Sequence, residues 1–303
     1  AIISQTSSMA DYVIFQSSGL GANPVVRPTG GAGLNDFGLA ISGPDYVTFD
    51  GIDVVIDSGS AVELGYLVRN ASSMNGASNN TIRNASVTLN RANTASIGIL
   101  QSAVETTAAG SGAGIAAGGD PAGGNQFNHY YNVSVQNSYK GIYLSATSLW
   151  TPAGGDTDNE IGVIGIGGKT VIGGPTANDI GGGTTATQTW GIRATAQRNV
   201  KIFQTEVRNV SANTTTDGIY LDQTVGLSEV SRNVVHDIRN NSTSSTSGTT
   251  GIRSNHFNNA SFTGIVNTVK NNFVYNITSA HTGSATSTRT LKGIYLQSSG
   301  GGF

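Results

Sequence analysis

The sequence contains no cysteine, and only 11% of its 303 residues are charged. Without cysteine the fold cannot rest on disulfides, so its stability has to come from packing and backbone hydrogen bonds. The small net charge of -2 argues against a nucleic-acid partner and against an anionic membrane surface. No apolar run approaches the roughly 20 residues of a transmembrane helix, so we expect no membrane insertion.

Helical periodicity is also scarce, whereas Gly, Asn, Ser and Thr are abundant. Apolar residues instead alternate in short bursts, such as YVTF at 46–49, KIF at 201–203 and NFVYNI at 272–277. Alternation with a period of two is typical of β-strands. Many short strands are compatible with a sandwich, a barrel or a solenoid, and internal repetition distinguishes these folds.

One short phrase recurs along the chain. KGIYL stands at 140–144 and again at 292–296, with WGIRA at 190–194, DGIYL at 217–221 and TGIRS at 250–254 between them. The glycines of this phrase lie 27 to 50 residues apart, at Gly38, Gly65, Gly98, Gly141, Gly191, Gly218, Gly251 and Gly293. Each interval contains three strand-like segments and no helical segment. The sequence therefore predicts one all-β domain over 1–303, a right-handed parallel β-helix with three short strands per rung and about eight rungs.

Strand alternation assigns a direction to each side chain of the phrase. Ile142 and Leu144 should enter the core while Tyr143 points outward. The same rule predicts a core lined by Ile142, Leu144, Ile192, Ile219, Leu221, Ile252, Ile294 and Leu296. Just after the third strand, Asn137, Asn209, Asp237 and Asn276 occupy equivalent places, where a tight corner needs the left-handed conformation that short polar residues tolerate.

The order of rung lengths repeats once. Gly38 and Gly191, Gly65 and Gly218, and Gly98 and Gly251 are each 153 residues apart. This spacing suggests duplication of a four-rung block, over about 1–152 and 153–303. Coincidence in loop lengths is the alternative explanation.

Several longer strings resemble a known group of proteins. SGPDYVTFDGIDV at 42–54, GYLVRNAS at 65–72 and NNTIRNASVTLNRANTASIGI at 79–99 are similar to the right-handed parallel β-helix repeat proteins of Bacteroidota. The resemblance covers most of the chain. It implies a very large exported protein, a cargo of type IX secretion with adhesin-like roles, located outside the cell or on its surface. The chain is then expected to be a segment of something longer.

Catalytic residues are harder to find. The fold hosts both enzymes and inert stalks, and the chain has no Asp-Asp pair of the kind that a polygalacturonase would use. A lyase would need an acidic calcium cluster beside a basic residue. Asp50, Asp53 and Asp57 with Arg83 are the nearest candidates, and Asp217 with Asp222 is another pair; solvated corner residues are the alternative interpretation. We assign no catalytic residue.

One loop carries a partial calcium pattern. GGDTDNE at 154–160 places Asp156, Asp158 and Glu160 at alternate positions, as oxygen-ligating loops do, but it lacks the remainder of an EF-hand. Calcium is thus a candidate ligand beside the alternative of an ordinary polar loop, and no other cofactor is expected. His236 is expected to be an exposed member of a ladder with Arg208 and Tyr275, and without acidic partners a general-base role is not expected.

The outward column of the repeated phrase alternates tyrosine and arginine, at Tyr143, Arg193, Tyr220, Arg253 and Tyr295. Such a column can stiffen the rod by cation–π stacking, or it can bind sugar rings. Two functions follow. The first is a non-enzymatic secreted or cell-surface structural or adhesin segment that binds glycans or polysaccharide, or that associates end to end into filaments. The alternative is a pectate-lyase-like enzyme that degrades polysaccharide.

Overall fold

The computed structural model describes residues 2–3, 11–31, 36–57, 61–72, 74–102, 123–146, 156–163, 165, 168–182, 188–243, 247–257, 266–281 and 291–299. Every named element among these residues is a β-strand, and none of the residues lies in an α-helix. Accordingly, none of them belongs to a helix long and apolar enough to cross a membrane.

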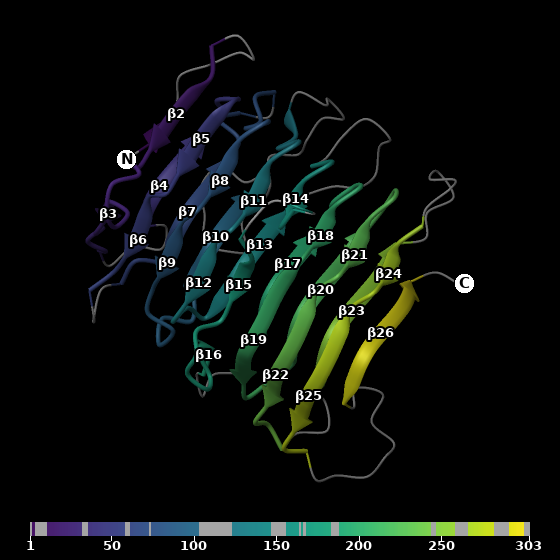
Figure 1. Cartoon of the computed structure of the whole chain (residues 1–303). Helices are drawn as coiled ribbons and strands as arrows, with labels where there is room; N and C mark the ends of the chain where they lie inside the picture. Colours follow the sequence, from purple (N-terminus) through teal and green to yellow (C-terminus); the bar gives the residue numbers. More distant parts are fainter. Residues whose placement is uncertain are drawn as a thin grey trace.

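The strands form three parallel sheets, which the chain visits in turn (Figure 1). Sheet A consists of β1 (Ile2–Ile3), β4 (Phe37–Ser42), β7 (Leu64–Arg69), β10 (Ile97–Ser102), β13 (Lys140–Ser145), β17 (Thr189–Thr195), β20 (Thr216–Thr224), β23 (Thr249–Phe257) and β26 (Lys292–Ser299). Sheet B consists of β2 (Val13–Gln16), β5 (Val47–Asp50), β8 (Thr81–Arg83), β11 (His129–Tyr131), β14 (Glu160–Ile161), β18 (Lys201–Phe203), β21 (Glu229–Ser231) and β24 (Thr268–Lys270). Sheet C consists of β3 (Val25–Val26), β6 (Asp53–Val55), β9 (Ser86–Thr88), β12 (Ser134–Gln136), β15 (Thr170–Ile172), β19 (Thr205–Ala212), β22 (Val234–Asn240) and β25 (Phe273–Ser279), with β16 (Ile180–Gly181) beside β19.

One strand from each sheet makes a rung, and about eight rungs stack from the N-terminal to the C-terminal end of the rod (Figure 1). The predicted parallel β-helix with three strands per rung is therefore confirmed. The repeated phrase forms the strands of sheet A, in register: Ile142 pairs with Ile192, Ile192 with Ile219, and Ile219 with Ile252.

The predicted core holds for all but the last strand of sheet A. Six of the predicted residues are 0% exposed, namely Ile142, Leu144, Ile192, Ile219, Leu221 and Ile252. Ile294 and Leu296 align with this column through β26, but they are 49% and 50% exposed because β26 has a neighbouring strand on one side only. For these two residues the prediction of burial was wrong.

The glycine of the phrase is required by close packing. A Cβ atom at Gly141 would collide with the carbonyl oxygen of Gly191 in the next rung and with the side chain of Ile172 in sheet C. Six other glycines of this column, all except Gly293, meet sheet C valines, such as Val207 at Gly191 and Val235 at Gly218. Only glycine lets sheet A approach sheet C this closely.

The corner residues adopt the predicted conformation. Asn137, Asn209, Asp237 and Asn276 have φ values of 49°, 54°, 56° and 50°. In three of the four rungs the strand continues past this residue, because β19, β22 and β25 run on through the bend. The corner is therefore a bend within the longer strands of sheet C and not the end of them.

A buried column of asparagines supports the corner between sheets A and B. The Oδ1 atoms of Asn80, Asn128 and Asn159 accept backbone N–H groups of the preceding rung, from Val47, Asn80 and Asn128, at 2.8 to 2.9 Å. All three asparagines are buried at 0–1% exposure. The column satisfies buried backbone donors where the sheets turn, and it connects each rung to the next.

The two halves of the chain distribute their loops differently. Residues 70–80 connect β7 to β8, whereas only residues 225–228 connect β20 to β21 at the position 153 residues later. Equal rung lengths therefore do not correspond to equal rung structures, and duplication of a four-rung block stays a hypothesis.

Candidate functional site

The tyrosine and arginine column of sheet A is continuous, as its sequence register predicted. Tyr143 pairs with Arg193, Arg193 with Tyr220, and Tyr220 with Arg253, which pairs with Tyr295. The Arg193 guanidinium lies 5.5 Å and 5.1 Å from the ring centroids of Tyr143 and Tyr220. The Arg253 guanidinium lies 4.4 Å from the Tyr220 centroid. These distances are those of cation–π contacts.

Two of the three tyrosine rings in this column are buried, whereas Tyr295 is partly exposed. Tyr143 and Tyr220 are 6% and 5% exposed, so little of either aromatic face is available to a sugar. Trp190, which sequence reasoning missed, lies edge-on to Tyr143 with centroids 5.3 Å apart, and Arg193 lies 4.8 Å over its ring. This burial favours the stacking interpretation over recognition at these two positions.

Two carboxylates on the same face of sheet A bond to side chains in and beside the column. Arg193 forms an ion pair with Asp222, which also accepts the Tyr220 hydroxyl at 2.9 Å. Burial raises the pKa of Asp217, which accepts Gln188 Nε2 at 2.8 Å. Asp217 and Asp222 are thus engaged in the packing of this face, which weakens their candidacy as catalytic residues.

Lys140 stands out on this face because its amine is buried. It lies 4.9 Å over the ring of Trp190, and the residue is 6% exposed. Burial and the neighbouring positive charge of Arg193 lower the pKa of Lys140 to about 8. Little in the sequence singles out Lys140, because the residue before the phrase glycine differs among the five recurring phrases: it is Lys, Trp, Asp or Thr.

The calcium pattern at 156–160 does not converge. Asp158 has a φ of 56°, and this left-handed residue breaks the alternation that would have placed the three carboxylates on one side. Asp156 lies inside the rod at 0% exposure, whereas Glu160 pairs outside with Lys201 at 2.9 Å. Within the described ranges no three Asp, Glu or His side chains group as metal ligands. The proposed calcium ligands Asp156, Asp158 and Glu160 therefore do not form a site.

Asp156 is instead surrounded by amide donors inside the rod. One carboxylate oxygen accepts the Asn125 backbone N–H at 2.8 Å, and the other accepts Gln101 Nε2 at 2.6 Å. Gln197 Nε2 lies 3.4 Å from the second oxygen. Burial dominates over these hydrogen bonds and raises the pKa of Asp156 to about 6.

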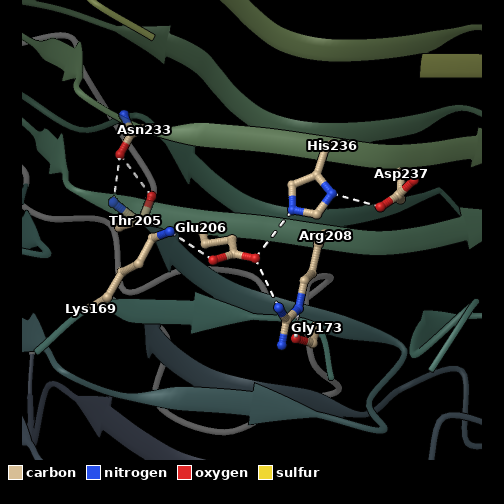
Figure 2. Close-up of polar contacts among 8 residues, drawn as sticks. All are labelled: Lys169, Gly173, Thr205, Glu206, Arg208, Asn233, His236 and Asp237. Atoms are coloured by element: carbon tan, nitrogen blue, oxygen red, sulfur yellow. Dashed lines mark hydrogen bonds and ion pairs between the residues drawn. The ribbon is translucent and has the colours of Figure 1, made fainter. Parts of the chain in front are cut away.

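Glu206 is the centre of a second polar cluster, on the outer face of sheet C (Figure 2). Its carboxylate contacts Lys169 Nζ at 2.7 Å, Arg208 Nη1 at 2.9 Å and His236 Nε2 at 3.1 Å. Partial burial opposes ionisation, but the hydrogen bonds and charges of these partners lower the pKa of Glu206 to about 2.

His236 differs from its prediction. It aligns with Arg208 and Tyr275 as predicted, and its ring stacks on Tyr275 with centroids 4.7 Å apart. Two parts of the prediction were wrong, however. The His236 side chain is only 13% exposed, and it has two acidic partners, Glu206 and Asp237. Since both ring nitrogens face carboxylates, neither is free to take a proton from a substrate.

The acidic residues proposed for a lyase are dispersed. Arg83 Nε donates to Asp50 at 2.9 Å, and Asp53 accepts Asn23 Nδ2 at 3.0 Å. Asp57 pairs with Arg27 at 3.1 Å. Each carboxylate thus has its own partner, and the three do not share one site.

Two shallow cavities lie along the corner between sheets B and C. The first, of about 330 Å³, is lined by Asn23, Asp53, Asn84, Ala85, Ser86, Asn132, Val133, Ser134 and Lys169. The second, of about 400 Å³, is lined by Gly168, Lys169, Gln204 and Arg232. Lys169 borders both, and the two neighbouring cavities are together called the B/C groove. Sequence reasoning missed it because its residues are tens of positions apart.

Comparison with known proteins gives no family. The chain matches no family model, and no curated protein matches it.

Proposed function

We propose that the chain is a non-enzymatic structural segment of a secreted or cell-surface protein, with an adhesin-like role. One observation supports this proposal above all: side chains link successive rungs by hydrogen bonds inside the rod and by cation–π contacts on its outer face. The asparagine column runs inside it, and the cation–π column of Tyr143, Arg193 and Tyr220 runs outside it. Repeats joined in this way resist bending and local opening, which a surface stalk needs.

The extracellular location and the type IX secretion route rest on the resemblance to Bacteroidota β-helix proteins. The absence of cysteine and the low charge are compatible with that environment. The proposal includes glycans as surface ligands, because the B/C groove is polar and open to solvent.

Contacts with further rungs form part of the proposal. The end strands expose apolar side chains whose equivalents are buried elsewhere in the rod, including Phe15 at 37%, Ile294 at 49% and Leu296 at 50%. Open strand edges with apolar side chains favour pairing with another strand. The partner rungs come either from the same longer polypeptide or from a second copy joined end to end into a filament.

A pectate-lyase-like enzyme is the alternative function. It would require carboxylates and a base to converge in a cleft. Asp50 with Arg83 is the only pairing of the residues proposed for it that the described structure brings into contact. An ion pair between neighbouring rungs also occurs in a purely structural ladder, so this contact does not favour the enzyme.

Mechanical unfolding of single molecules tests the proposal. A stalk should resist force and then yield in small steps as rungs peel away one after another. Incubation with polygalacturonate, with and without calcium, provides the enzymatic test. Unsaturated products that absorb ultraviolet light, and that disappear in Asp50→Asn, would establish the lyase instead.

A further inference from the structure

We propose that the B/C groove binds an extended acidic polysaccharide, whose carboxylates contact Lys169 and Arg232 and whose hydroxyls contact Asn84 and Asn132. This inference rests on the proposed adhesin-like function and assigns it a site and a class of ligand.

The backbone of the corner between sheets B and C builds the groove. Asn84, Asn132, Gln204 and Arg232 each directly follow a strand of sheet B, and their φ values are 54°, 49°, 45° and 58°. This left-handed conformation turns each side chain out along one line that follows the axis of the rod. It is uncommon for a residue as bulky as arginine, and such strain is concentrated at functional positions.

Two glycines lie at this corner where a side chain would not fit. In the rung between Asn132 and Gln204 the equivalent position is Gly162, where a Cβ would collide with the carbonyl oxygen of Phe203. At Gly168 a Cβ would collide with the side chain of Asn132. Neighbouring atoms thus fill both Cβ positions, so the chain passes close to the adjacent rungs at this corner without a side chain of its own.

The amides of the groove keep hydrogen-bonding capacity for a ligand. Asn132 Nδ2 donates to Asn84 Oδ1 at 2.6 Å, and Asn84 Nδ2 donates to Asp50 Oδ1 at 2.6 Å. Each amide nitrogen carries two hydrogens, so one N–H of each remains for a hydroxyl. The ladder meanwhile holds both side chains in place, which reduces the entropy lost on binding.

The charge of the groove favours an acidic sugar. Lys169 and Arg232 are exposed, and among the ion pairs of the described residues none involves Arg232. Lys169 shares its carboxylate partner, Glu206, with Arg208 and His236 (Figure 2). Lys169 and Arg232 line this end of the groove, whereas Asp53 lines the other end, so a sugar carboxylate fits beside the two cations.

The shape of the groove excludes other polymers. It follows a corner of the rod rather than an open strand edge, so a peptide cannot extend a sheet there. Two cations without an aromatic platform are too few for nucleic acid, which needs several phosphate contacts and stacking surfaces. The rungs advance about 4.8 Å each along the axis, and an extended polysaccharide laid along them presents hydroxyls at every sugar.

Calorimetric titration with oligogalacturonate, against a neutral galactan of the same length, tests the inference. Wild-type protein should bind the acidic oligomer in preference, and more weakly as salt is added. Arg232→Gln should weaken that binding about tenfold, because one charge-assisted contact is lost. Glutamine suits this position, since Gln204 adopts the same backbone conformation one rung earlier. Asn132→Ala should weaken binding about three- to tenfold.

Arg239→Gln is the matched control, because Arg239 is equally exposed but does not line the groove. It should bind as the wild type does, and melting curves should show that all variants are folded. If the groove variants bind normally, or if the neutral oligomer binds equally well, the inference is wrong. The stalk function would survive that result, because it is judged separately by mechanical unfolding.

Discussion

The side chain of Gln101 donates to the carboxylate of Asp156 at 2.6 Å inside the rod. The two residues are 0% exposed, and the hydrogen-bond donors to this carboxylate are neutral. Tyr130 is a further titratable group near this carboxylate, and its hydroxyl donates to Gln101 Oε1 at 2.7 Å. A buried charge without a cation should make the stability of the rod depend on pH in a way that a solvated carboxylate would not.

We predict that this dependence is largest between about pH 4 and pH 6. The pKa of Asp156 is raised from 3.8 to about 6, so the folded chain binds more protons than the unfolded chain in this window. The contribution of Asp156 is therefore most favourable at about pH 4 and declines, on the order of 3 kcal/mol, as pH rises through 6. Asp156→Asn should flatten the curve of unfolding free energy against pH. Urea unfolding at several pH values measures it, with Asp158→Asn as the control that should keep the wild-type slope.

Glu206 should give a dependence of the opposite sign. Its pKa is lowered to about 2, so its contribution is fully present above about pH 4.5 and is lost as pH falls toward 2. Glu206→Gln should cost about 1 kcal/mol at pH 7, a modest amount because Lys169 is 45% exposed and solvent screens the pair. The difference between variant and wild type should shrink in acid and in high salt. A constant difference from pH 7 to pH 2 would contradict the role of the ion pairs.

The Tyr220 and Arg253 contact should stabilise the rod directly. The guanidinium lies 4.4 Å from the ring centroid, and a double-mutant cycle with Tyr220→Leu and Arg253→Met should yield a coupling of about 0.5 to 2 kcal/mol. Chemical denaturation of the four proteins provides the numbers. If the pair recognised a glycan instead, the variants would lose binding and keep their stability, and the coupling would be near zero.

Glycine in the repeated phrase should be indispensable within the stack. Gly141→Ala should cost about 3 kcal/mol or more, because the added methyl meets backbone of the next rung and a packed isoleucine. Gly293→Ala is the matched control within the same KGIYL phrase, since no atom of the described residues lies within 4 Å of its Cβ position. Thermal melting distinguishes the two, and equal losses would show that close packing is not the reason for the glycine.

The sequence was sufficient to predict the rungs because each one repeats a physical requirement at the same place. Gly141 and Gly191 need close approach, Ile142 and Ile192 fill the core, and Asn209 and Asp237 turn a corner. The rule that side chains alternate in direction gave a wrong prediction where the backbone is not extended. The left-handed Asp158 separates Asp156 from Glu160, although the spacing alone placed them together.

Contacts between rungs could not be predicted with the same success. The partners of His236 come from 30 residues earlier and from its own neighbour, and the sequence gives no sign that Glu206 would lie within reach. The B/C groove depends on Gly168 and Lys169 lying beside Asn132 and Gln204, which requires knowing where each loop leaves the rod. Repetition thus identifies the scaffold, and the irregular connections decide what the scaffold can bind.

The stacking of rungs also gives the chain the properties of a ruler. Each rung adds about 4.8 Å along the axis, so the length of the rod is proportional to the number of rungs. Inserting or deleting one rung would change the distance between whatever is attached at its two ends by that single increment. Because each rung contacts mainly its neighbours, such a change would leave the distant rungs, and any ligand held in the B/C groove, undisturbed.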